Sequence, residues 1–102
     1  MDAISTLVKK KVKEALTFSR ILLFGSRARN DADEQSDYDL LVVVPNSISI
    51  REKISVRTSI RKKLLASGIR SDILIQSEEE LKSKKLIPGH IIKTIMREGV
   101  TL

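Results

Sequence analysis

The stretch LLFGSRARNDADEQSDYDLLVVV, residues 22–44, contains the features that decide the fold. Two apolar blocks, RILLF (20–24) and YDLLVVV (38–44), predict buried β-strands because aliphatic and β-branched residues dominate them. Gly25 ends the first block and Pro45 ends the second. The same stretch carries five acidic residues, Asp31, Asp33, Glu34, Asp37 and Asp39. A protein with a formal net charge of +6 therefore places much negative charge beside its most apolar segment.

Outside this stretch, apolar residues recur at helical spacing on both sides of a third predicted strand. Ser49 and Glu52 match a capping box that opens a long helix, and Ser77 and Glu80 match another. The predicted elements are a helix over 2–17, a strand over 20–24, a helix over 26–31 opening at Ser26, a strand over 38–44, a helix over 49–67 closed by Gly68, a strand over 69–76, a short helix opening at 77–80, and a last helix within 86–99 ended at Gly99.

The inward faces of these helices follow from the same spacing. We expect the first helix to bury Ile4, Leu7, Val8, Val12 and Leu16, the long helix Ile50, Ile54, Ile60 and Leu64, and the last helix Ile91, Ile92 and Ile95.

Alternating helices and strands predict an α+β or α/β fold, a small mixed β-sheet of three to four strands flanked by helices. The fourth strand would come from GVTL at 99–102. No linker rich in Pro, Gly or Ser divides the chain, so we predict a single domain over residues 1–102.

Composition narrows the function classes. Cysteine is absent, which excludes disulfides and thiolate metal sites. No signal peptide or long apolar run is present, so we expect a cytoplasmic protein without membrane contact. Basic residues cluster at 9–13 and 57–70, but aromatic residues that would stack on bases are scarce. We therefore do not expect nucleic acid as a direct ligand.

The carboxylates Asp37 and Asp39 lie two residues apart at the start of a predicted strand, where alternation would direct both to one face. Like charges side by side repel each other unless a cation compensates them, and oxygen ligands suit Mg²⁺ or Mn²⁺. Asp72 lies near the start of the next predicted strand and would join them if the two strands are neighbours. The alternative is that these aspartates are turn residues or edge charges.

The pair Gly25 and Ser26 lies where a strand meets a helix start, and helix starts favour phosphate. Arg29 follows Ser26 by three residues, so both lie on one helical face and could bind a phosphate together. Arg27 lies on a different face, which favours a plain surface charge.

Gly25-Ser26, ten residues, Asp37-x-Asp39 and a later acid at Asp72 resemble the signature of the DNA polymerase beta-type nucleotidyltransferase superfamily. The chain is most similar to its small branch, the minimal nucleotidyltransferases (MNT), and its tail, PGHIIKTIMREGVTL, resembles theirs. Family members usually have Gly where this chain has Asn30; because Asn tolerates positive φ, the turn can survive.

The resemblance implies transfer of AMP from ATP to a hydroxyl acceptor. Asp37, Asp39 and Asp72 would be the catalytic residues and would hold two Mg²⁺ ions, with Mn²⁺ as a substitute. Gly25, Ser26 and Arg29 would bind the nucleotide phosphates. A chain of this length has little room for an acceptor site, so a partner or a second copy in a homo-oligomer should supply that surface.

The resemblance further implies that the partner is a HEPN-domain toxin, with one of its tyrosines as the acceptor and this chain as the antitoxin. Three alternatives remain open on the residues alone. They are an antitoxin that neutralises a HEPN partner by binding only, an adenylyltransferase for a small molecule, and a nucleic-acid-binding module.

Overall fold

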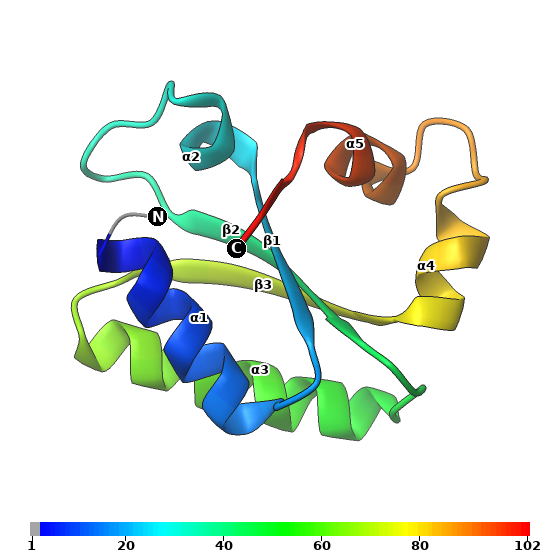
Figure 1. The fold of residues 1–102 in the computed structure, drawn as a ribbon, viewed down its shortest axis with the longest axis horizontal. Coiled ribbons are helices and arrows are strands. Elements are labelled where there is room, and N and C mark those ends of the chain that lie inside the picture. Colours follow the sequence, from blue (N-terminus) through cyan, green and yellow to red (C-terminus); the bar gives the residue numbers. More distant parts are fainter. Residues whose placement is uncertain (1–2) are drawn as a thin grey trace.

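A computed structural model of the chain describes residues 3–102. Helices and strands alternate along most of the chain, and β1 and β4 meet near the C-terminus (Figure 1). The elements are α1 (Ala3–Ala15), β1 (Arg20–Phe24), α2 (Gly25–Arg29), β2 (Tyr38–Val44), α3 (Ile50–Ala66), β3 (Ser71–Ser77), α4 (Glu78–Lys84), α5 (Ile91–Glu98) and β4 (Val100–Thr101).

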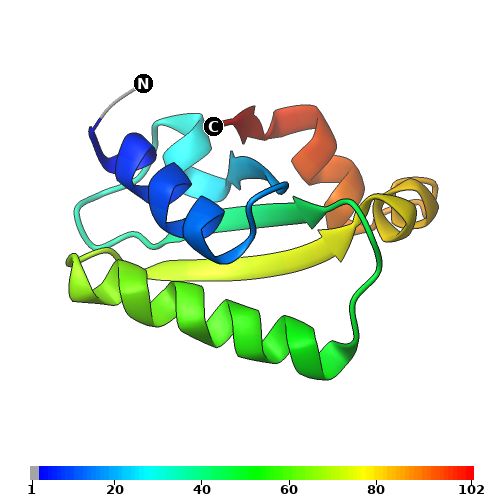
Figure 2. The same cartoon turned by 60° about the horizontal axis from the view of Figure 1, so that its bottom comes forward.

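The four strands form one mixed sheet in the order β3-β2-β1-β4. β1 pairs antiparallel with both β2 and β4, whereas β2 and β3 run parallel and are joined through α3. Figure 2 shows the arrows of β2 and β3 pointing the same way, with α3 alongside them. The predicted mixed sheet of three to four strands is therefore confirmed, including the short C-terminal strand.

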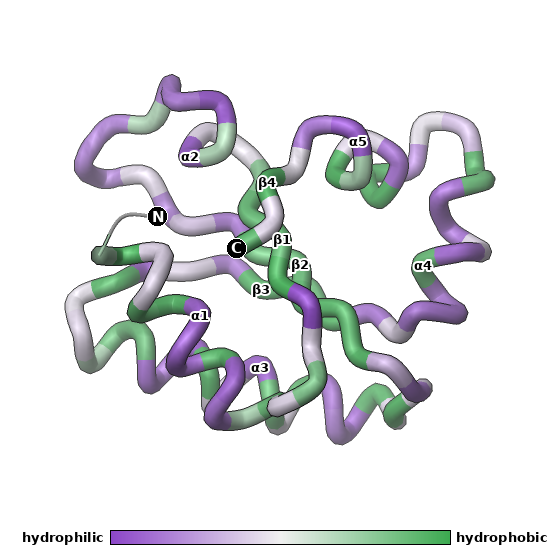
Figure 3. The backbone as a smooth tube through the Cα atoms, in the orientation of Figure 1, coloured by the Kyte–Doolittle hydropathy of each residue, from purple (hydrophilic) through white to green (hydrophobic). Residues whose placement is uncertain are grey.

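Each face of the sheet carries its own apolar layer, because successive side chains on β2 point to opposite sides. Leu40 and Val42 pack with Val8 and Val12 of α1 and with residues of α3. Leu41 and Val43 pack on the other face with residues of α4 and α5 (Figure 1). Apolar residues accordingly concentrate along the central strands in Figure 3.

Four inward-facing predictions were wrong. Ile50 and Ile54 of α3 are exposed, because the face of this helix that packs on the apolar layer carries Val56, Ile60 and Leu64, and neither isoleucine continues that four-residue spacing. Ile4 is exposed near the start of α1. Ile91 is exposed because it opens α5, whereas Ile92 and Ile95 are buried as expected.

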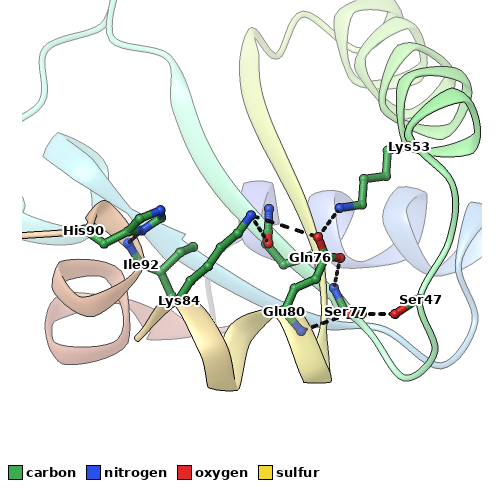
Figure 4. Close-up of polar contacts among 8 residues, drawn as sticks. All are labelled: Ser47, Lys53, Gln76, Ser77, Glu80, Lys84, His90 and Ile92. Carbon is green, nitrogen blue, oxygen red and sulfur yellow. Dashed lines mark hydrogen bonds and ion pairs between the residues drawn. The ribbon is translucent and has the colours of Figure 1, made fainter. Parts of the chain in front are cut away.

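A polar cluster fixes the junction of β3 and α4 (Figure 4). Ser77 accepts a hydrogen bond from the Glu80 backbone N–H at 3.1 Å, and Glu80 accepts one from the Ser77 N–H at 3.0 Å, which completes the predicted capping box. Lys53 of α3 contacts the Glu80 carboxylate at 2.6 Å. His90 caps α5 in the same region by accepting from the Ile92 N–H at 3.1 Å.

None of the helices within residues 3–102 combines the length and the apolar character needed to cross a bilayer.

Candidate active site

Two of the predicted carboxylates lie side by side at the edge of the sheet where β2 and β3 begin. Asp39 and Asp72 are register partners across the parallel pair, so their side chains share one face. That face is the one that carries Leu41, on the side of α4 and α5. The condition that strands two and three be neighbours is thus met.

The Gly25 backbone lies directly against the Asp39 carboxylate. Phe24 pairs with Asp39 across β1 and β2, which brings the first residue of α2 beside the acid. A Cβ atom built on Gly25 would be 2.1 Å from the Asp39 Oδ2 atom, and Gly25 has a φ of +70°. A side chain is excluded at this position both by space and by backbone conformation.

The electrostatics at Asp39 are unfavourable for its ionised form. Partial burial raises the pKa of Asp39 above its ordinary value, and the charges of Asp72 and Asp37 raise it further. Arg29 opposes this by lowering the pKa of Asp39, but its effect is the smallest. Burial and the two neighbouring acids thus outweigh Arg29 at Asp39, which is an environment that a divalent metal would relieve.

Asp37 points elsewhere. It precedes Tyr38, the first residue of β2, so strand alternation does not fix its direction. Its Oδ1 atom lies 3.4 Å from the Nε of Arg70, and it lines a hollow of about 260 Å³ with Arg61 and Ser71. Within residues 3–102, no three His, Cys, Asp or Glu side chains are grouped as a metal site. Asp39 and Asp72 are thus together, and Asp37 would have to leave Arg70 to join them.

The predicted phosphate-binding residues lie beside the pair but differ in detail from expectation. α2 begins at Gly25, and Phe24 is its N-cap, so Ser26 is not the cap. Arg29 is near enough to lower the pKa of Asp39, yet its Nε also contacts Asp31 at 3.1 Å. Asn30, the C-cap of α2, has a φ of 60°, which confirms that Asn adopts the positive-φ turn expected at this position.

Arg27 has a role that the helix spacing did not reveal. Its Nη2 donates to the Ser36 carbonyl oxygen at 2.9 Å, and its guanidinium carbon lies 4.4 Å from the centroid of the Tyr38 ring. The prediction of a plain surface charge was therefore wrong. Arg27 meets Tyr38 only through the pairing of β1 with β2, which spacing within one helix does not show.

The sequence that forms this site is similar to that of a known protein family. The sequence model of the nucleotidyltransferase domain family matches residues 5–101, which include every residue of the site. The chain belongs to the nucleotidyltransferase domain family. The expected resemblance to minimal nucleotidyltransferases is confirmed at this level, and the chain is a nucleotidyltransferase.

Two relatives of this nucleotidyltransferase come from archaea. Protein adenylyltransferase MntA of Thermococcus cleftensis is 33% identical over 100 residues, which cover 98% of this chain and 90% of that protein. MJ0141 of Methanocaldococcus jannaschii, provisionally named a protein adenylyltransferase, is 39% identical over 71 residues, which cover 65% of this chain and 66% of that protein.

The fold also matches a solved structure described as a toxin–antitoxin with AMP-PNP. The TM-score is 0.64 at 17% identity, and the match covers 98% of this chain and 72% of that chain. At this identity the likeness shows the fold alone.

Proposed function

We propose that this nucleotidyltransferase is a Mg²⁺-dependent protein adenylyltransferase that transfers AMP from ATP to a tyrosine hydroxyl of a HEPN-domain toxin, and so acts as its antitoxin. Relatives named protein adenylyltransferases support the reaction, and the fold shared with a toxin–antitoxin structure supports the partner class. The observation that carries the proposal is the Asp39–Asp72 pair with the Gly25 backbone seated against Asp39.

The donor set fits a divalent cation. Asp39 and Asp72 offer only oxygen atoms, which suits Mg²⁺ or Mn²⁺. Burial, followed by the charges of Asp72 and Asp37, raises the pKa of Asp39, and a bound cation would relieve this effect. Asp37 would complete the ligand set after exchanging Arg70 for the metal. When bound, two Mg²⁺ ions would stabilise charge on the attacking oxygen, the α-phosphate and the leaving pyrophosphate.

The chain's own residues would perform the remaining tasks. The acceptor oxygen bonds to the α-phosphorus of ATP, the bond from that phosphorus to the bridging oxygen breaks, and pyrophosphate leaves. Asp72 is the more exposed acid of the pair, so it can take the proton from the acceptor hydroxyl. Gly25, Ser26 and Arg29 would hold the β- and γ-phosphates, with Arg29 released from Asp31.

A transfer assay tests the proposal. The protein is incubated with Mg²⁺, ATP labelled in the α-phosphate and a purified HEPN-domain partner, in parallel with the Asp39→Asn variant. We expect label on a partner tyrosine with wild-type protein and none with Asp39→Asn. If the partner gains no label, yet both proteins neutralise its toxicity equally, the binding-only alternative replaces the enzymatic one. Label on an added aminoglycoside alone would instead favour a small-molecule acceptor.

A further inference from the structure

The loop over residues 30–37 leads into the carboxylate-bearing strand and has few apolar anchors of its own. Most of its residues are exposed. Asp33 organises its turn by accepting from the Gln35 N–H at 2.8 Å, and the Ser36 N–H donates to the Asp33 carbonyl at 3.2 Å. These bonds shape the loop internally but do not attach it to the sheet.

Two arginines make that attachment at consecutive carbonyls. Arg70, just before β3, donates to the Gln35 carbonyl oxygen. Arg27, in α2, donates to the Ser36 carbonyl oxygen at 2.9 Å. The two carbonyls belong to the two residues before Asp37. Together with the hydrogen bond from the Tyr38 N–H to the Arg70 carbonyl oxygen at 2.9 Å, these contacts set the position at which the chain enters β2.

The two contacts differ in environment. The Arg70 side chain is 53% exposed, and its ion pair with Asp37 at 3.4 Å is of the weak, exchangeable kind. Arg27 is partly buried over the Tyr38 ring, and its Nε is buried without a hydrogen-bond partner among the described residues. Leaving a buried donor unpaired is costly, and the contacts of Arg27 with the Tyr38 ring and the Ser36 carbonyl offset that cost and hold the side chain in place.

Arg27 also adjoins the other half of the site, because it follows Gly25 and Ser26 in α2. One side chain therefore connects the turn that lies against Asp39 with the backbone that leads to Asp37. Groups outside the ligand shell that fix ligand orientation commonly govern metal affinity.

We infer that Arg27 is a positioning residue that fixes Asp37 and the Gly25–Ser26 turn relative to each other, and so sets the affinity of the carboxylate site for divalent cations. The inference rests on the proposed function, because it assumes that Asp37 joins a cation site. Arg27 itself would touch neither substrate nor cation.

The test measures Mn²⁺ binding to the nucleotide-free protein, by calorimetry or by the electron paramagnetic resonance signal of free Mn²⁺. Arg27→Gln removes the charge and the fork of donors, and we expect its dissociation constant for Mn²⁺ to rise about 10- to 100-fold. Arg51→Gln, an exposed arginine at the start of α3, is the matched control and should bind Mn²⁺ as wild type does.

Arg27→Lys keeps a charge and an apolar stem but loses the planar fork, so it should fold even if Arg27→Gln does not. We expect its dissociation constant to rise by a smaller factor, about threefold or more. Folded Arg27 variants that bind Mn²⁺ as tightly as wild type, even with lowered thermal stability, would overturn the inference and leave the proposed function standing. Wild-type protein that binds no Mn²⁺ would overturn both.

Discussion

The two ends of β3 differ in whether their charged and polar side chains have favourable partners. At its start, Asp72 lies beside Asp39, and the charge of Asp72 makes the ionised form of Asp39 less favourable. At its end, Ser77 and Glu80 satisfy each other's backbone N–H groups, and Lys53 pairs with the Glu80 carboxylate (Figure 4). The pKa of Asp39 is accordingly raised, whereas the hydrogen bond from Lys53 lowers the pKa of Glu80.

Within the seven residues of β3, one end therefore contributes to stability and the other to function. The polar groups at the end of β3 find their partners inside the protein, so they contribute to folding. The carboxylates at its start do not, so they reduce stability in exchange for a place where a cation and a phosphate can bind. Natural proteins tend to keep such locally unfavourable arrangements at functional sites.

Removing the charge of Asp39 should have the largest effect. Asp39→Asn would lower adenylyl transfer about 1,000-fold, since metal-stabilised charge accounts for several kcal/mol of the barrier. The same variant should be more stable than wild type in metal-free buffer, by less than about 1 kcal/mol, because a like-charge contact is lost. Transfer rates and chemical unfolding measure the two effects. A variant that is less active and also less stable would contradict the contrast between the two ends of β3.

Gly25→Ala should have the next largest effect, with about 100-fold lower transfer activity. The added Cβ would lie 2.1 Å from the Asp39 Oδ2 atom, so the carboxylate would have to move. Gly68→Ala is a matched control, since Gly68 also has a positive φ, of +79°, but nothing lies within 4 Å of the added atom. Both variants should lose about 1–2 kcal/mol of stability from the backbone alone. Equal activity losses in the two variants would show that the contact with Asp39 is irrelevant.

At the opposite end of β3, Ser77→Ala should lower the free energy of unfolding by about 1 kcal/mol, because the Glu80 N–H loses its acceptor. Transfer activity should stay at the wild-type level. The control is Ser83→Ala, at an exposed serine of α4, the helix that Ser77 caps; it should change stability by less than about 0.5 kcal/mol. Loss of activity in Ser77→Ala without loss of stability would mean that this end of β3 also serves the reaction.

The smallest effect concerns pH. Glu80→Gln keeps the helix cap but removes the negative charge that pairs with Lys53. We expect this to lower the free energy of unfolding by about 0.5 kcal/mol near neutral pH. The pKa of Glu80 is lowered in the folded protein, so its contribution is complete above the ordinary value of 4.5 and is lost as the pH falls through the folded value. Unfolding curves of the two proteins should therefore converge on acidification. A difference that grows toward low pH would contradict this assignment.

Much of this fold follows from local patterns. Apolar and β-branched blocks locate the first three strands, and the capping residues Ser49 and Ser77 locate two helix starts. Exposure of Ile50, Ile54 and Ile91 does not follow from periodicity, because several apolar residues lie near one helical face and packing decides which of them the layer covers.

The candidate site could likewise be predicted only in part from the sequence. Asp39 and Asp72 could be paired from sequence once β2 and β3 were assumed to be neighbours, because alternation then fixes their face. The direction of Asp37 could not be predicted, since Asp37 precedes β2 and its partner Arg70 lies just before β3. The contact between Arg27 and Tyr38 likewise arises only from the pairing of β1 with β2.

A cation site at the start of β3 is tested most directly by measuring the unfolding of wild-type protein and Asp39→Asn, each in EDTA and in millimolar Mn²⁺. If the start of β3 is a cation site, Asp39→Asn is the more stable protein in EDTA, and Mn²⁺ stabilises only wild type, by an amount set by its concentration and affinity. Mn²⁺ that leaves wild type unchanged, or that stabilises both proteins equally, would contradict the claim.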